Sequence, residues 1–137
     1  MDSEKEFLSS YNKNEYGKPS VAVDLLVFTV KDDRLKIVLV RRSEHPFKDM
    51  LSLPGVFVGI NETLDEAAAR GAREEAGLAD IYFEQLYTWG DIDRDPRMRI
   101  ISVSYLSLTP AEKLTLSAGS RTSSAELYDC LLYTSPS

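Results

Sequence analysis

Cysteine and histidine are nearly absent from this sequence. Its 137 residues include one cysteine, Cys130, and one histidine, His45. A single cysteine excludes an internal disulfide and is compatible with a reducing compartment. No histidine or basic residue lies beside Cys130 to activate its thiol, and His45 falls in a polar stretch that we interpret as a loop. We expect neither residue to carry the chemistry of the protein.

Long apolar runs and an excess of basic residues are also missing. No stretch approaches the roughly 18 apolar residues that span a membrane, and the N-terminal MDSEKEFLSS lacks the apolar core of a signal peptide. Twenty-two acidic residues outnumber 16 lysines and arginines, giving a net charge of −6. This balance argues against unspecific nucleic-acid binding. The absences together predict a cytoplasmic protein that contacts neither membranes nor nucleic acid directly.

The most informative stretch covers residues 54–78, which read PGVFVGINETLDEAAARGAREEAGL. Its glycines and proline predict a tight loop, followed by a helix of about 13 residues. Residues 63–66 have capping-box form, in which the Thr63 hydroxyl and the Glu66 carboxylate each accept from the other's backbone N–H. Gly77 suits the left-handed residue that closes a helix.

The acidic residues of this helix fall in unusual places. At about 100° per residue, Glu75 lies inside the apolar stripe and Glu74 at its edge, beside Arg70. A carboxylate on the packing face is costly unless it is paired or binds a cation. Glu62 adds a third acid near the start of the helix, and oxygen clusters suit Mg²⁺ or Mn²⁺. The alternative is a solvated helix end whose acids pair with nearby arginines.

This stretch resembles the Nudix box, Gly-x5-Glu-x7-Arg-Glu-U-x-Glu-Glu-x-Gly-U, in which U is aliphatic. Glu62 and Arg70 take the first Glu and the Arg. Most later positions are also filled, by Ala72, Glu74, Glu75, Gly77 and Leu78. Two positions depart from the pattern, because Val56 stands where the first Gly belongs and Gly71 replaces the Glu that follows the Arg.

The resemblance implies a Nudix-type α/β/α sandwich with a mixed β-sheet, and hydrolysis that depends on Mg²⁺ or Mn²⁺. It implies metal ligation by Glu62, Glu74 and Glu75. Glu74, Glu75 and Arg70 would be catalytic, with the arginine orienting the acids through a salt bridge. In the family the residue at position 71 is a metal ligand or general base, and losing a positioned base costs about 10²–10⁴ in rate. Helix angles place Gly71 between Glu74 and Glu75, so the base is unassigned; Glu112 and Glu126 are distant candidates.

A second stretch of the sequence resembles one particular branch of the Nudix family. Residues 90–108, GDIDRDPRMRIISVSYLSL, are similar to the Nudix branch of ADP-ribose pyrophosphatases and Nudix-related transcriptional regulators. In those regulators the Nudix domain often has a degenerate box, senses ADP-ribose or a related effector, and precedes a winged-helix DNA-binding domain. Arg94, Arg97 and Arg99 could clamp the phosphates of a substrate. A solvated loop of mixed charge is the alternative.

The remaining sequence predicts a mixed sheet with helices packed against it. We expect strands at residues 21–30, 35–40, 51–53, 81–89, 100–108 and 125–133, with the fifth of these half-exposed and a flexible loop at 117–124. Residues 1–18 are expected to form a loose arm, residues 19–129 the Nudix domain, and residues 130–137 a tail foreign to it. The second helix that covers the sheet in Nudix domains is not evident. We therefore expect an exposed apolar sheet face and, from it, a homodimer or other oligomer.

Two functions follow from the sequence. The first is a Mg²⁺-dependent hydrolase that cleaves the diphosphate of a nucleoside diphosphate linked to a further group, with ADP-ribose as the best guess. The second is a catalytically impaired domain that binds ADP-ribose or a related metabolite as an effector. Glu74 and Glu75 favour the enzyme, whereas Val56 and Gly71 favour the sensor.

Overall fold

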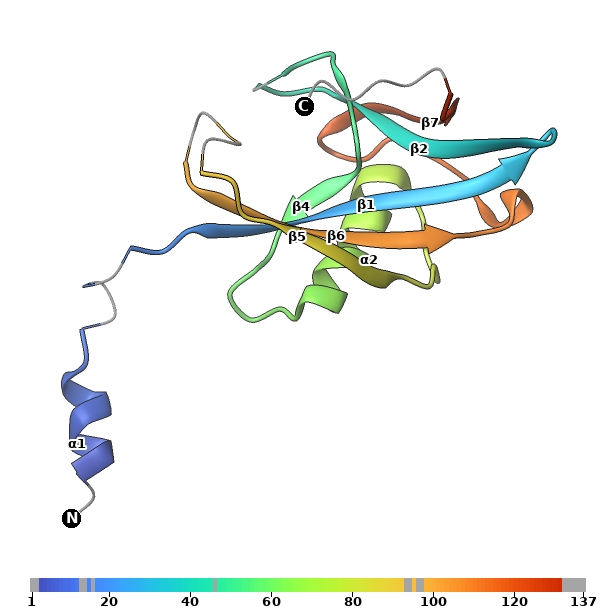
Figure 1. Cartoon of the computed structure of the whole chain (residues 1–137). Coiled ribbons are helices and arrows are strands. Elements are labelled where there is room, and N and C mark those ends of the chain that lie inside the picture. The colour runs from blue at the N-terminus through green and yellow to red at the C-terminus, as the bar shows by residue number, and fades with distance from the viewer. Residues whose placement is uncertain are drawn as a thin grey trace.

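The computed structural model describes residues 3–12, 15, 17–45, 47–92, 95 and 98–131. In this part of the chain, one seven-stranded sheet carries a single packed helix, α2 (Figure 1). The helices are α1 (Ser3–Ser10), α2 (Leu64–Ala76) and the short 3₁₀ helix η1 (Ala111–Lys113). The strands are β1 (Ser20–Lys31), β2 (Arg34–Arg42), β3 (Leu51–Ser52), β4 (Gly55–Phe57), β5 (Glu84–Trp89), β6 (Ile100–Leu108) and β7 (Thr122–Asp129). The predicted mixed sheet with helical cover is confirmed.

Strand β1 is the centre of the sheet. It pairs in parallel with β6 along its length, while its other edge pairs first with β4 and then with β2. The strand order is β3-β2-β1-β6-β5, and β7 adds to β2. Because β1 changes partner half-way along, its second edge is divided between β4 and β2. The chain enters β4 next to this division and leaves β4 at its other end, where Phe57 lies opposite Ala22, before it continues to α2.

Helix α2 packs closely on the sheet because its inner face carries small residues. The buried positions are Ala67, Ala68, Gly71, Ala72, Glu75 and Ala76, and they face the β-branched and aliphatic side chains of β1. The capping box at Thr63 and Glu66 is formed, and Gly77 closes the helix with a φ of 70°. The predicted start and end of this helix are therefore confirmed.

Several predicted strand bounds were wrong. The predicted tight loop of residues 54–59 contains strand β4, and the strand predicted at 81–89 begins only at Glu84. Ile81 and Phe83 instead pack against the core from an irregular segment. Strand β7 begins at Thr122, inside the predicted flexible loop, and ends at Asp129. Residues 132–137, most of the predicted tail, lie outside the described part of the chain.

Strand β6 is more buried than predicted. Its polar residues Ser102, Ser104 and Ser107 are each no more than 5% exposed, because β6 lies between β1 and β5. Two of these hydroxyl groups have partners: Ser104 accepts from the Trp89 indole at 2.9 Å, and Ser107 lies 2.7 Å from the hydroxyl of Thr109, just beyond β6. Hydrogen bonding of this kind removes most of the cost of burying a polar group.

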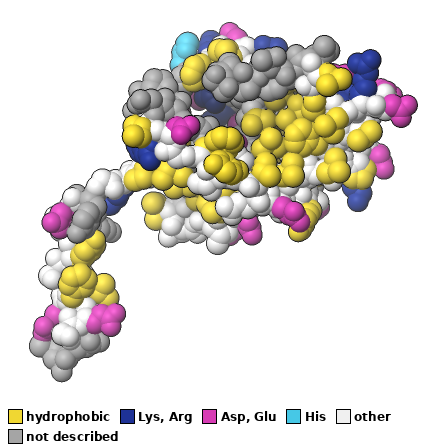
Figure 2. All heavy atoms as spheres, in the orientation of Figure 1, with side chains coloured by type: hydrophobic (Ala, Val, Ile, Leu, Met, Phe, Trp, Pro, Cys, Tyr) yellow, Lys and Arg dark blue, Asp and Glu magenta, His cyan; other side chains and the backbone are white. Residues whose placement is uncertain are grey.

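Among the described residues, apolar side chains are exposed at one end of the sheet face opposite α2, near the β1–β2 hairpin and the end of β6. Val30, Leu35 and Leu108 are 60%, 47% and 71% exposed, and by strand register they belong to one face. Figure 2 shows apolar side chains gathered over these strands. Helix α1 also stands apart from the sheet and has no buried residue (Figure 1). In the described part of the chain, no helix has the length and apolar character to cross a membrane.

Candidate functional site

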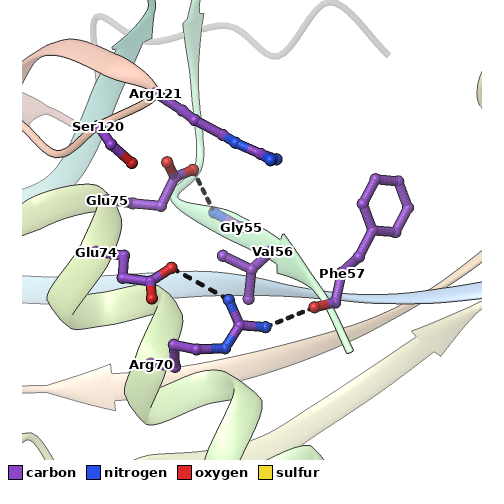
Figure 3. Close-up of a pocket in the computed structure, with 8 residues that line it drawn as sticks. All are labelled: Gly55, Val56, Phe57, Arg70, Glu74, Glu75, Ser120 and Arg121. Atoms are coloured by element: carbon purple, nitrogen blue, oxygen red, sulfur yellow. Dashed lines mark hydrogen bonds and ion pairs between the residues drawn. The ribbon is translucent and has the colours of Figure 1, made fainter. Parts of the chain in front are cut away.

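A hollow of about 400 Å³ opens between the C-terminal half of α2, strand β4 and the loop before β7 (Figure 3). Its lining residues come from three separate segments of the chain: Gly55, Val56 and Phe57; Arg70, Glu74 and Glu75; and Ser120 and Arg121. The predicted catalytic residues therefore lie together at one concave surface.

Arg70 organises one side of this hollow. Its Nε and Nη2 donate to the two Glu62 carboxylate oxygens at 2.7 and 2.9 Å. The same guanidinium donates to Glu74 at 3.1 Å and to the Phe57 carbonyl at 2.7 Å. Bidentate pairing of this kind is directional as well as strong. Arg70 thus ties the loop before α2, strand β4 and the last turn of the helix to one another.

Both carboxylate oxygens of Glu62 accept hydrogen bonds from neighbouring groups of the protein. Besides Arg70, it accepts from the Gly59 backbone N–H at 2.9 Å. The hydrogen bonds from Arg70 and Gly59 lower the pKa of Glu62 to about 2. Glu62 does not line the hollow, and the described residues contain no group of three acidic, histidine or cysteine side chains placed to hold a metal ion.

Glu75 has the opposite environment. The residue is 7% exposed, and its carboxylate accepts one long hydrogen bond, 3.4 Å from the Gly55 backbone nitrogen. Burial raises the pKa of Glu75, and the Gly55 N–H and the positive charges of Arg42 and Arg121 oppose that rise. A buried carboxylate with one weak donor is a favourable partner for a cation.

Glu74 and Glu75 are the two acids that line the hollow, and their oxygen atoms are of the type that a hard divalent cation prefers. Mg²⁺ in proteins is commonly held by one or two carboxylates together with phosphate oxygens of a bound ligand. Glu74 and Glu75 supply such a pair, from adjacent positions at the end of α2. The donor set is hard and all-oxygen, which suits Mg²⁺ or Mn²⁺ rather than softer metals.

The two departures from the box pattern are in contact with each other. A Cβ on Gly71 would lie 3.1 Å from the Val56 Cγ2 atom and 3.5 Å from the Leu25 Cδ1 atom. Position 71 therefore faces Val56 on β4 and Leu25 on β1, so a side chain placed there would contact these two residues first. The Val56 side chain fills the space in which an acid at position 71 would begin.

Of the three arginines predicted to clamp the phosphates, the structure describes one, Arg99, and its side chain does not line the hollow. Arg99 donates to the Gly90 carbonyl at 2.7 Å and is not a lining residue. Arg94 and Arg97 lie outside the described residues. The candidate bases Glu112 and Glu126 are exposed and do not line the hollow, and His45 is exposed in its loop.

The sequence alone did not reveal Ser120 and Arg121. They belong to the stretch SAGSRTSS, whose composition indicated only a flexible loop. In the structure this loop is fixed to the end of α2: the Ser117 N–H donates to the Ala76 carbonyl, and the Thr122 hydroxyl donates to the Glu75 carbonyl. A single arginine among small polar residues was the only available signal.

Comparison with known proteins identifies the family. The model of the NUDIX domain matches residues 18–131. The chain belongs to the Nudix family. It is 37% identical over 110 residues to the ADPR responsive transcriptional repressor NtrR of Acinetobacter baylyi, covering 79% of this chain and 44% of that protein. It is 39% identical over 115 residues to the ADP-ribose pyrophosphatase of Methanocaldococcus jannaschii, covering 83% of this chain and 64% of that protein.

Solved structures agree with this assignment. The NUDIX domain of Shewanella oneidensis NrtR, solved in complex with ADP ribose, superposes with a TM-score of 0.85 at 30% identity, covering 94% of this chain and 84% of that one. A MutT/nudix family protein from Enterococcus faecalis gives a TM-score of 0.84 at 32% identity, over 93% of this chain and 50% of that one. The chain spans about half to two-thirds of the length of the curated relatives.

Proposed function

We propose that this Nudix domain binds a nucleoside diphosphate of the ADP-ribose type as an effector and hydrolyses it slowly or not at all. The observation that carries the proposal is the contact between Val56 and Gly71. Position 71, where the Nudix pattern has a glutamate, carries no side chain, and a Cβ there would lie 3.1 Å from the apolar Val56 Cγ2 atom. The domain thus retains the hollow and two acids but lacks the third acid.

Glu74 and Glu75 would hold a single Mg²⁺ or Mn²⁺ ion, with phosphate oxygens of the ligand completing the coordination. Glu62 contributes indirectly, because the arginine that it anchors also holds Glu74. When bound, the ion would neutralise phosphate charge and lower the pKa of a bound water. No residue of the hollow beyond these two acids is suited to take a proton from that water.

A Nudix hydrolase with the turnover of an ordinary enzyme is the second candidate. It is supported by the intact pair Glu74 and Glu75, by the Arg70 contacts that hold Glu74 in place, and by the similarity to the Methanocaldococcus jannaschii ADP-ribose pyrophosphatase. In this case the base would come from a residue outside the hollow, with Glu112 and Glu126 as the remaining candidates.

One pair of measurements separates the two functions. Titration calorimetry with ADP-ribose measures binding, and release of AMP in the presence of Mg²⁺ or Mn²⁺ measures turnover. We expect binding without appreciable turnover. Turnover at the rate of an ordinary enzyme, about 1 per second or faster, would favour the hydrolase, and absence of binding under all conditions would contradict both functions.

We further propose that the segment acts in the cytoplasm. We also propose that it does not contact nucleic acid, because its net charge of −6 is unfavourable for binding phosphate backbones. The apolar face carrying Val30, Leu35 and Leu108 supports self-association with a second copy.

A further inference from the structure

Arg121 is the guanidinium at the hollow that remains available to a ligand. Among the described residues its side chain makes no hydrogen bond or ion pair, and the only electrostatic partner of that side chain is Glu75. By contrast, Arg70 donates to Glu62, Glu74 and the Phe57 carbonyl at the same time. Figure 3 shows the Arg121 side chain extending across the hollow on the side of Glu75.

The backbone beneath Arg121 is held on both sides. Its carbonyl accepts from the Ser43 N–H at 3.1 Å, next to the end of β2. Two residues before Arg121, the Gly119 N–H donates to the Thr122 hydroxyl at 2.7 Å, and that hydroxyl donates to the Glu75 carbonyl at 3.1 Å. A Cβ on Gly119 would overlap the Glu74 carbonyl, so only glycine lets the loop pass this close to α2. The exposed side chain therefore projects from a fixed base, which reduces the entropy lost when it binds a ligand.

The acidic residues at the hollow require a positively charged side chain that can contact the phosphates. Glu74 and Glu75 are both acids, and a diphosphate brought beside them would be repelled unless positive charge lies close by. The Arg70 charge is already shared between Glu62 and Glu74. Arg121 is the remaining lining residue with a positive charge, and a guanidinium matches the geometry of phosphate oxygens in a bidentate manner.

We infer that Arg121, together with the hydroxyl of its neighbour Ser120, binds a phosphate group of the nucleoside diphosphate in this hollow. The inference rests on the proposed function and adds the contact that recognises the diphosphate. It also makes Arg121 the main phosphate partner when no divalent cation is bound. With Mg²⁺ on Glu74 and Glu75, the phosphate gains a second positive partner, so its dependence on Arg121 decreases.

The test is titration of ADP-ribose into wild type, Arg121→Gln, Arg121→Lys and Arg73→Gln, each in EDTA and in Mg²⁺. Arg73 is an exposed arginine on α2 that does not line the hollow, so its variant controls for the loss of one positive charge. Circular dichroism and thermal unfolding verify that each variant is folded. We expect Arg121→Gln to weaken binding at least about tenfold in EDTA and clearly less in Mg²⁺. Arg121→Lys should retain part of the affinity, and Arg73→Gln should remain within about twofold of wild type.

The outcomes distinguish this inference from the proposed function. If wild type binds ADP-ribose and Arg121→Gln binds equally well in EDTA, the inference is wrong and the proposed function stands. An equal loss in EDTA and Mg²⁺, or a loss no larger than that of Arg73→Gln, also overturns it. Should wild type bind no ADP-ribose in either condition, the proposed function fails, and the inference fails with it.

Discussion

Val56 occupies the space into which a side chain at position 71 would extend. A Cβ on Gly71 would lie 3.1 Å from Val56 Cγ2, closer than side chains normally approach. The two departures from the Nudix box therefore lie side by side: β4 has a branched side chain where the pattern has a glycine, and α2 has a glycine where the pattern has an acid. Either substitution alone would leave a clash or a void in this contact.

This contact predicts that Gly71→Glu alone will not rebuild a catalytic site. We expect the variant to lose about 1–3 kcal/mol of stability through overpacking against Val56, with little gain in hydrolysis. The double variant Val56→Gly/Gly71→Glu should recover part of that stability when Mg²⁺ is present, and should raise ADP-ribose hydrolysis by at least about 10²-fold over wild type.

Denaturant unfolding with and without Mg²⁺, and AMP release, measure these effects, with Val56→Gly as the control. A Gly71→Glu single variant that is as stable as wild type and hydrolyses ADP-ribose quickly would show that the Val56 side chain can move aside at little cost in stability. In that case the two positions would act independently.

Glu75→Gln should separate metal binding from stability. Burial raises the pKa of the Glu75 carboxyl, so the stability that the protonated form provides is lost as the pH rises through that pKa in the folded state. Near neutral pH without metal, the glutamine variant should be at least as stable as wild type. With Mn²⁺ or Mg²⁺, wild type should gain thermal stability and the variant should gain little. Mn²⁺ relaxation on both proteins, with Glu126→Gln as control, tests this; equal Mn²⁺ affinities would rule out Glu75 as a ligand.

The Arg70–Glu62 pair predicts a specific pH dependence. Arg70 and the Gly59 N–H hold the pKa of Glu62 at about 2, below its ordinary value of 4.5. A depressed pKa in the folded state stabilises the protein above about pH 4.5, and that contribution is lost as the pH falls toward 2. In Arg70→Gln, the carboxyl resonance of Glu62 should titrate closer to its ordinary pKa. The stability difference between wild type and variant should shrink on acidification. An unshifted Glu62 titration in the variant would show that Gly59 alone depresses the pKa.

The uncovered sheet face predicts self-association. Leu108→Lys places a charge on an apolar surface where Leu108 is 71% exposed, so it should shift the protein toward the monomer. The matched control is Ile60→Lys, since Ile60 is 99% exposed in the loop before α2. Light scattering over a range of concentrations measures the change. A wild type that is a monodisperse monomer at all concentrations, with a high and cooperative unfolding midpoint, would contradict this prediction.

Local sequence patterns determined the central helix and the identity of the site. The capping box at Thr63, the closing Gly77 and the position of Glu75 on the packing face depend on residues at most a few turns apart, so they can be read directly from the sequence. The same short range explains why the Glu62, Arg70 and Glu74 set was recognisable from its spacing. Strands β1 and β2 were predicted for the same reason.

Only the tertiary structure decided which residues from distant segments are buried or lie next to helix α2. The burial of β6 follows from its parallel pairing with β1, a contact between residues about 80 positions apart in the chain. Val56 and Gly71 meet only because β4 pairs with β1 beneath α2. Arg121 reaches the hollow because the loop before β7 is hydrogen-bonded to the last turn of α2. Such contacts depend on how strands pair and pack across the whole fold, and no local period or spacing in the sequence records them.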